Sequence, residues 1–582
     1  GRTTDAAELM VLRGHRVRAA HQIRKVLSRL GDPVLARHAA HEIVSGEALG
    51  GEGASREARA ELLSLLLRNP AVSGAARDYL VELLRELQAR HATLADEARR
   101  RLPTAASTHE VLARRISTRR LGEAVDEVGC SLRACGVASP APAPAGAADI
   151  EPLAGGRLRE LRAARRQELS ALPAGDARRR HLLREIERLD LVLGRPVEAE
   201  VERARRDLAG EDESARRALR DRRVVTPEEA GFALHPLIGW KAANLAEVAR
   251  LGGGLVPPWF VVTDHAFGEA LDAPLPRPGA EATVPGAATL REAVALLLAR
   301  DDLDNGRKSA LIRSLWEGAQ LPEELSREVR AAYRRLAEAP GGDGGEPDEG
   351  IGPFVAIRSS AREEDAELAA RAGEFETFLF VRGEERVLEH LKRAWSGLWT
   401  ERAIHNRSLA GLGSDRAGGG VLVQRMVRSR VSGVLQTVSV AGGEPREMVI
   451  NVGLGLGEGI VSGTVAADHV VVAKEGDLQR GPLRFRYVTA DKGEQVVFDG
   501  RAGIGTARVE CRYHQRLRPA LEYVELAELV AVADRLEAAY SYPLDIEFGI
   551  EGPRLFILQA RPVPTFLSLL HETLERHPLE GP

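Results

Sequence analysis

The loop Ile238-Gly-Trp-Lys-Ala-Ala-Asn-Leu245 places a glycine and a lysine directly before an apparent helix. A strand-to-helix turn of this kind presents backbone N–H groups to an anion, and the ammonium group of Lys241 adds a point charge that suits phosphate. Lysine is scarce, since only six of the 81 Lys and Arg residues are lysines. Lys241 is therefore a candidate phosphate ligand, and a plain turn followed by a surface lysine is the alternative.

A second candidate is Arg358, which ends a β-like run in the segment 355–365. Its planar guanidinium can bond phosphate oxygens as a fork. A loop of small residues follows, in which Gly373 lets the backbone approach a ligand closely and which ends at Thr377. The alternative is a surface ion pair between Arg358 and one of the acidic residues 363–365.

A third segment, 421–427, is an apolar strand that carries Gln424 and Met426 and ends at Val427. Adenine needs a flat apolar slot with amide or backbone hydrogen bonds to its edge, and such a strand can supply both. A simple core strand is an equally good interpretation of this segment alone.

The C-terminal segments 545–550 and 555–562 are predicted to form a β-hairpin. Glu547 lies on its first strand, and the period of two puts Gln559 and Arg561 on one face of the second. A carboxylate and an amide oxygen can ligate Mg²⁺ while an arginine meets phosphate. An exposed hairpin with polar side chains is the alternative.

In order and spacing, these segments resemble the nucleotide-binding domain of the phosphoenolpyruvate synthase and pyruvate phosphate dikinase family, a group that includes rifampicin phosphotransferases. The resemblance covers about 340 residues. It is carried by GWKAANL (239–245), VPPWFVVT (256–263), IRSSAREED (357–365), RAGEFETF (371–378), SGLWTERA (396–403), VLVQRMV (421–427), GLGLGEGIVSG (453–463) with Asp468, and DIEF with LQARP (545–548 and 558–562).

The resemblance implies a role for each candidate. Phosphate contacts come from Lys241, Arg358, Gly373 and Thr377, adenine contacts from Gln424, Met426 and Val427, Mg²⁺ ligation from Glu547 and Gln559, and γ-phosphate stabilisation from Arg561. The cofactors implied are ATP and Mg²⁺, and the catalytic residues are Arg561, Arg358 and Lys241. Two glycines of the family's Gly-Gly-Lys-Gly loop are replaced here by Trp240 and Ala242, so the loop must be reshaped if they need positive φ.

In this family the ATP domain phosphorylates a histidine on a separate swivelling domain. None of the 15 histidines lies in the family's Thr-Ser-His-Ala context. We therefore expect a phosphohistidine-carrier partner, in the same parent chain or on a separate subunit, and an ATP-dependent phosphotransferase that is incomplete without it. The start at Gly1 and the end after the LQARP motif favour a fragment. The final acceptor, a small molecule or a glycan, stays open. A degenerate nucleotide-binding scaffold or regulatory protein and a direct small-molecule kinase are the alternatives.

The elements that must position these residues differ along the chain. The helical periodicity of residues 1–135 predicts a bundle or solenoid-like domain. We expect a Pro/Ala-rich linker at residues 136–156 and a charged helical hairpin at residues 157–221. Glycine-punctuated β-rich segments begin near residue 225. The fold class is thus multidomain, with an all-α N-terminal region followed by a two-lobed α+β ATP-grasp domain at 225–566, a break between lobes near 340–350, and a tail at 567–582.

The composition of the chain limits the classes of binding partner and the cellular setting that we expect. The net charge of −4 and the pI near 6.5 do not indicate nucleic acid or an anionic membrane as a binding partner. No apolar run of about 18 residues predicts a membrane span. Three cysteines cannot form a disulfide framework, which fits a reducing, cytoplasmic setting.

Overall fold

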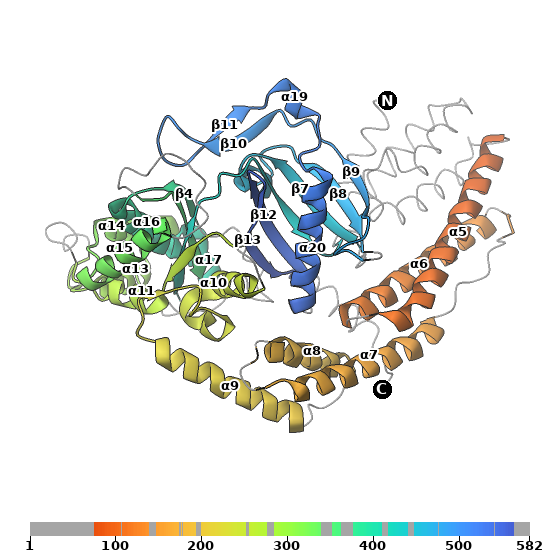
Figure 1. Ribbon diagram of the computed structural model, residues 1–582, viewed down its shortest axis with the longest axis horizontal. Helices are drawn as coiled ribbons and strands as arrows, with labels where there is room; N and C mark the ends of the chain where they lie inside the picture. The colour runs from red at the N-terminus through yellow and green to blue at the C-terminus, as the bar shows by residue number, and fades with distance from the viewer. Residues whose placement is uncertain are drawn as a thin grey trace. The chain divides into compact units, whose positions relative to one another are not determined.

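Figure 1 shows the computed structural model, which describes residues 75–563 apart from 106–107, 135, 139–146, 174–175, 177, 194–198, 252–254, 276–283, 339–351, 362–375, 410–416, 440–446, 475–476 and 541. The chain divides into two compact units. One is built on residues up to Val201, and the other on residues 202–437 and 448–567.

The described residues before Val224 are helical, which confirms the predicted all-α N-terminal region for this part of the chain. The helices are α5 (Ala75–Arg101), η1 (Leu102–Thr104), α6 (Thr108–Ala134), α7 (Ala147–Ala171), α8 (Arg178–Val192) and α9 (Ala199–Leu219). Helices α5 and α6 pack along each other, and the Gln88 amide donates to the Val125 carbonyl oxygen at 3.1 Å. The Arg162–Asp190 ion pair, buried on both sides, joins α7 to α8. Apolar periodicity and a few buried polar contacts therefore hold these helices together.

Helix α7 begins at Ala147, within the segment 136–156 that was predicted as a linker, and has Pro152 inside it. The helix-forming residues that follow the proline outweigh its missing N–H. The Pro-rich stretch 139–146, the first 74 residues and the tail at 567–582 lie outside the described residues. The predicted domain boundaries stay predictions.

The first sheet of the second unit has five antiparallel strands in the order β1-β2-β5-β3-β4. They are β1 (Val224–Val225), β2 (Trp259–Val262), β3 (Val355–Ala361), β4 (Thr377–Val381) and β5 (Gly419–Arg425). The central strand β5 reads GGVLVQR and is buried at every position but the last, which explains its almost continuous apolar sequence.

Helices cover this sheet (Figure 1). One apolar core lies between them, to which Phe267, Trp316, Trp395 and Trp399 contribute stacked or tilted rings. They are α11 (Asp264–Leu271), α13 (Leu290–Leu298), α14 (Asn305–Gly318), α15 (Glu323–Glu338), α16 (Glu384–Ser396), η3 (Gly397–Trp399) and α17 (Glu401–Leu409). Several begin at a side-chain cap, such as the Thr289 capping box of α13. Capping and the apolar faces together fix these helices on the sheet.

The second sheet has six strands in the order β13-β12-β6-β7-β8-β9. They are β6 (Val431–Gln436), β7 (Glu447–Leu454), β8 (Asp468–Ala473), β9 (Arg484–Val488), β12 (Leu544–Glu551) and β13 (Arg554–Pro562). The predicted C-terminal hairpin is confirmed, since β12 and β13 pair antiparallel. Helix α20 (Tyr523–Tyr540) packs on β12 and β13. The helical N-terminal region is thus followed by an α+β part with antiparallel sheets.

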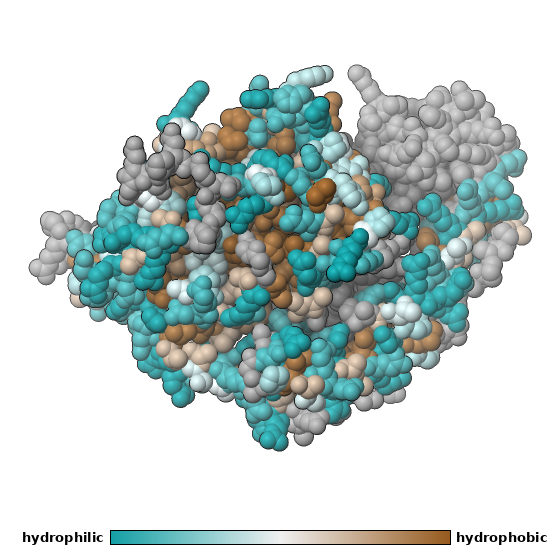
Figure 2. All heavy atoms as spheres, in the orientation of Figure 1, coloured by the Kyte–Doolittle hydropathy of each residue, from teal (hydrophilic) through white to brown (hydrophobic). Residues whose placement is uncertain are grey.

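A separate hairpin of β10 (Glu494–Phe498) and β11 (Thr506–Glu510) leads to the short α19 (Tyr513–Arg516). Apolar side chains gather at the surface over this hairpin in Figure 2. Val509, Tyr513 and Leu517 are exposed there. The hairpin is therefore only partly packed against the rest of its unit.

The break between lobes predicted near residues 340–350 falls on a segment outside the described residues and stays a prediction. Strand β2 precedes that segment and β3 and β5 follow it, yet all three belong to the first sheet. The chain passes to the second sheet between β5 and β6. Helix α10 (His235–Arg250) lies between the two sheets, because it contacts β3 and β5 of the first and β13 of the second.

The predicted strand-to-helix turn at Gly239 is also different from the structure. A short 3₁₀ turn, η2 (Phe232–Leu234), precedes α10, and Gly239 interrupts the helix itself with φ 78° and ψ 164°. A Cβ atom at this position would lie 1.8 Å from the Ser360 carbonyl oxygen. Both the left-handed φ and the close approach to β3 require glycine.

We predict that Gly239→Ala lowers the free energy of unfolding by about 2 kcal/mol or more, from the left-handed backbone and the overlap with Ser360 together. Thermal or urea unfolding of the full chain measures the loss. The control is Gly503→Ala, where φ is 69° but no atom lies within 4 Å of the added Cβ. Equal losses in the two variants would contradict the importance of the contact with β3.

Candidate functional site

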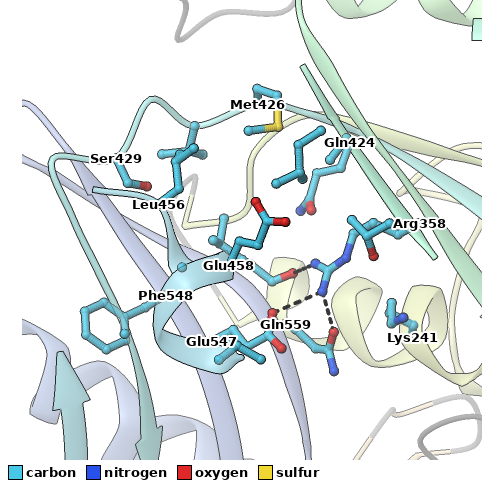
Figure 3. Close-up of a pocket in the computed structure, with 18 of the residues that line it drawn as sticks. Lys241, Arg358, Gln424, Met426, Ser429, Leu456, Glu458, Glu547, Phe548 and Gln559 are labelled. Atoms are coloured by element: carbon cyan, nitrogen blue, oxygen red, sulfur yellow. Dashed lines mark hydrogen bonds and ion pairs between the residues drawn. The ribbon is translucent and has the colours of Figure 1, made fainter. Parts of the chain in front are cut away.

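A cavity of about 610 Å³ lies within the second unit and is lined by both of its large sheets. Figure 3 shows the side chains that point into it. Nine of the ten predicted site residues line the cavity, and the tenth, Gly373, lies outside the described residues. The nine are Lys241, Arg358, Thr377, Gln424, Met426, Val427, Glu547, Gln559 and Arg561.

Arg358 extends from β3 of the first sheet to the hairpin of the second, as the dashed lines in Figure 3 show. Its Nη1 donates to the Leu558 carbonyl oxygen at 3.0 Å. Its Nη2 donates to Glu547 Oε2 at 3.0 Å and to Gln559 Oε1 at 2.6 Å. Only 12% of this side chain is exposed, so the guanidinium is a largely desolvated cation held by three oxygens. The predicted surface pair of Arg358 with residues 363–365 cannot be compared, because those residues lie outside the described part.

Glu547 and Gln559 converge because they are register partners on β12 and β13. The pairing shifts directly after this position, between Glu547 and Phe548, as in a β-bulge. The two oxygens already meet at one cation, the Arg358 guanidinium, so the donor set fits a hard metal ion. The described residues contain no cluster of three or more His, Cys, Asp or Glu that would hold a metal without water or phosphate. Mg²⁺ usually keeps water or phosphate oxygens among its ligands, so it matches the pair of Glu547 and Gln559 best.

Lys241 is buried on α10, and its Nζ donates to the Ser359 carbonyl oxygen at 2.9 Å. The Ser360 hydroxyl accepts from the Ala242 N–H at 3.2 Å, so this turn of α10 is fixed to β3. Thr377 begins β4 as the register partner of Arg358. Helix α10 and the first sheet thus bring two cations, Lys241 and Arg358, and the hydroxyl of Thr377 to the wall of the cavity.

Arg561 lines the cavity with a partner that sequence reasoning missed. Its Nε and Nη2 donate to Asp545 Oδ2 at 3.1 and 3.0 Å, and the two residues are register partners. Asp545 lies two positions before Glu547, on the same face of β12. That spacing was the available signal, but only the strand register assigns Asp545 to Arg561.

The other end of the cavity is apolar. Met426 and Leu456 lie there, and Gln424 points into the cavity from β5 (Figure 3). Val427 and Leu379 also line the cavity. Gln424 is 3% exposed, and its amide Nε2 has no hydrogen-bond partner in the described part of the chain. A buried amide without a partner is costly, and a ligand that accepts from it would remove that cost.

Trp240 and Ala242 do not distort the loop. Both have helical backbone geometry, since Gly239 alone departs from it within α10. The Trp240 ring stacks on His235, with ring centroids 4.1 Å apart and an interplanar angle of 19°. Trp240 is not among the residues that line the cavity. The family's second glycine is therefore replaced without loss of the one positive φ that the turn uses.

Comparison with known proteins identifies the second unit. Residues 235–569 match the family described as pyruvate phosphate dikinase, AMP/ATP-binding domain. The phosphoenolpyruvate synthase of Aeropyrum pernix is 34% identical, over 62% of this chain and 44% of the relative. A probable phosphoenolpyruvate synthase of Pyrococcus horikoshii is 31% identical, over 58% and 43%, and a rifampicin phosphotransferase of a Streptomyces species is 31% identical, over 60% and 36%.

The chain spans less than half the length of each of these relatives. The predicted resemblance and the predicted adenine nucleotide are confirmed by the matched family. Among the described helices, none is long and apolar enough to cross a membrane.

We predict that Trp240→Gly lowers the free energy of unfolding by about 1 to 3 kcal/mol, from the helix propensity of glycine and the lost aromatic packing. ATP affinity should change less than about twofold, since the side chain lies outside the cavity. Unfolding and equilibrium binding are measured on the same samples. His235→Ala, which removes the stacking partner, should show part of the stability loss. A large gain in affinity in Trp240→Gly would mean instead that Trp240 obstructs the nucleotide.

Proposed function

Since the chain belongs to the family of pyruvate phosphate dikinase AMP/ATP-binding domains, we propose that residues 225–566 form an ATP-grasp domain that binds Mg-ATP in this cavity. The domain transfers a phosphoryl group to a histidine on another domain or subunit. One observation carries the proposal: nine site residues expected from separate segments of the sequence line a single cavity. Its volume of about 610 Å³ suits a nucleotide.

The proposed roles follow from the chemistry at each end. Met426 and Val427 bind adenine, and the Gln424 amide donates to its edge. Lys241, Arg358 and Thr377 bind the phosphates, with Gly373 expected beside them. Glu547 and Gln559 hold Mg²⁺, which neutralises charge on the transferring group when bound. Mg²⁺ and the Arg358 guanidinium compete for the side-chain oxygens of Glu547 and Gln559. When the metal takes these oxygens, the guanidinium can donate to phosphate oxygens instead.

Arg561 is proposed to act on the transferring phosphoryl group. Phosphoryl transfer needs charge neutralisation and in-line positioning more than covalent help. Asp545 holds two donors of Arg561 on one oxygen, which limits rotation of the guanidinium. Asp545 is thus a positioning residue for Arg561.

The carrier histidine and the acceptor are proposed outside the described residues. Among the described residues no histidine lines the cavity, and in our proposal a second domain or subunit brings one to the phosphate. Two of the relatives are named phosphoenolpyruvate synthase and rifampicin phosphotransferase, and their names point to different acceptors. The nucleotide domain therefore does not specify the acceptor, which we place among small molecules or glycans.

The experiment adds radiolabelled Mg-ATP to the full chain, with and without a separately produced phosphohistidine domain of a relative. Label on the histidine domain supports the proposal. ATP binding without transfer to any acceptor would favour the scaffold or regulatory alternative. Transfer to a small molecule without any histidine domain would favour a direct kinase.

We predict that Glu547→Gln weakens Mg-dependent ATP affinity by about tenfold, because a hard cation loses its charged ligand. Titration of ATP at several Mg²⁺ concentrations measures the effect. The matched control is Glu551→Gln on the same strand, whose carboxylate accepts from the Arg428 N–H and does not line the cavity. Unchanged Mg²⁺ dependence in Glu547→Gln would exclude this carboxylate as the metal ligand.

We predict that Arg561→Ala reduces the rate of phosphate transfer by about 10²-fold or more and changes ATP affinity only a few-fold. The reason is that a guanidinium facing the transferring group gains most as charge moves onto its oxygens. Arg561→Lys keeps the charge but loses the fork, so it should rescue transfer only in part. Binding, transfer and thermal unfolding are measured for each variant. A wild-type transfer rate in Arg561→Ala would show that the role is wrong, and joint loss of binding and folding would show that Arg561 is structural.

A further inference from the structure

The six-stranded sheet ends at β9 (Arg484–Val488), and no other described strand pairs with the outer edge of β9 (Figure 1). Every residue of β9 is exposed except Tyr487, which is half-buried. Backbone N–H and C=O groups at such an edge can pair with another extended segment. Five strand spacings, or roughly 24 Å, separate β9 from β13. A partner bound at this edge would therefore not need to enter the cavity.

The two faces of β9 differ in chemistry, because side chains alternate along a strand. Phe485 lies on the same side as α20, and its ring centroid is 6.0 Å from that of Tyr523. Both rings remain accessible, with 41% of Phe485 and 49% of Tyr523 exposed. Arg486 and Val488 lie on the opposite face. One face of the edge is thus apolar and the other carries positive charge.

The positive charge on this second face is not compensated by neighbouring residues. Arg486 is exposed and makes no ion pair or hydrogen bond in the described part of the chain. The β8 residues opposite this face are His469, Val471 and Ala473, and none of them is acidic. Burial and then the positive charge of Arg486 lower the pKa of His469, which therefore stays neutral near pH 7. An acidic ligand group is the favourable partner for this face.

Charged side chains on an edge strand also act against self-association. If β9 paired antiparallel over its full length with β9 of a second copy, Arg486 would lie opposite Arg486. Like charges directly opposite each other destabilise a sheet, so a second copy does not suit this edge. Protection alone does not explain the apolar face, where Phe485, Tyr523 and the neighbouring Val524 are all exposed. A partner of opposite charge would satisfy both faces.

We infer that the free edge of β9 binds an extended acidic segment of a partner protein as an added strand. The backbone of that segment pairs with β9. Its acidic side chains lie on the face of Arg486, and its alternate apolar side chains cover Phe485 and Tyr523. Backbone pairing supplies the affinity, and the alternation of acidic and apolar side chains supplies the specificity. The inference is independent of the proposed binding of ATP.

The experiment measures binding of labelled peptides to the full chain by fluorescence anisotropy. One peptide alternates glutamate with valine, and a second alternates lysine with valine. The wild-type chain should bind the glutamate peptide about tenfold or more tightly than the lysine peptide. Two further versions of the glutamate peptide carry N-methyl groups on the glutamates or on the valines. Since alternate N–H groups of an added strand point to β9, at least one of these versions should lose binding.

Variants test the residues of β9. Arg486→Glu should abolish the preference for the glutamate peptide, and Phe485→Ser should weaken binding of that peptide. The matched control is Arg508→Glu on β11, which changes the net charge equally at another exposed strand and should retain the preference. Thermal unfolding of each variant shows whether it is folded.

Several outcomes would overturn the inference, and the first two need no variant to fold. They are equal binding of the glutamate and lysine peptides by the wild-type chain, and full binding of both N-methylated versions. A preference that survives in folded Arg486→Glu, or that is lost equally in Arg508→Glu, would mean that β9 is not the site. Self-association of the wild-type chain that the glutamate peptide does not reverse would assign the edge to a second copy instead.

Discussion

The hydrogen bonds of Arg358 connect the two sheets of the second unit, and the arrangement of the site depends on them. The guanidinium leaves β3 and meets three oxygens on the C-terminal hairpin. The strands that supply Glu547 and Gln559 therefore keep a fixed distance from the strand that supplies Arg358. A partly buried ion pair contributes little net stability, because desolvation offsets most of its attraction. Removing one partner is costly, so the group acts chiefly to hold the position of the site.

The apolar end of the cavity depends on a strained residue. Phe380 in β4 has φ 56°, an uncommon conformation for a bulky side chain. With this conformation, Leu379 lines the cavity. The Phe380 ring packs against Phe498 of the β10–β11 hairpin and against Phe354, with ring centroids 4.6 and 5.7 Å apart. The β10–β11 hairpin is thus connected through aromatic packing to the strand that also carries Thr377. Movement of the hairpin would change both ends of the cavity.

Sequence patterns correctly predicted the helices and the hairpin, because interactions between residues close in sequence determine these elements. The helices before Val224 follow apolar periodicity, and the β12–β13 hairpin follows alternation on each side of a tight turn. The failures involve contacts between distant residues. The sequence of residues 340–350 does not indicate that β2, before this segment, pairs with β5, after it. The order of strands in a sheet depends on packing between residues more than 150 positions apart. The pairing of Asp545 with Arg561 likewise needs the register, and the Thr506 partner of Glu458 lies 48 residues away in sequence.

Family motifs mix residues of the site with residues that hold the fold, and hydrogen bonding tells them apart. Asp468 follows the GLGLGEGIVSG motif, but it is fully buried and accepts from Lys492, Tyr487, Ala490 and Ala520. Burial and the nearby carboxylate raise the pKa of Tyr487, which keeps that phenol a donor. Asp468 is already satisfied by these donors and does not line the cavity, so its role is structural. Glu458, within the motif itself, has an oxygen facing the cavity, and the Gln424 amide has an unused donor there. The buried Gln424 amide can complete its hydrogen bonding with a ligand, whereas Asp468 does not need one.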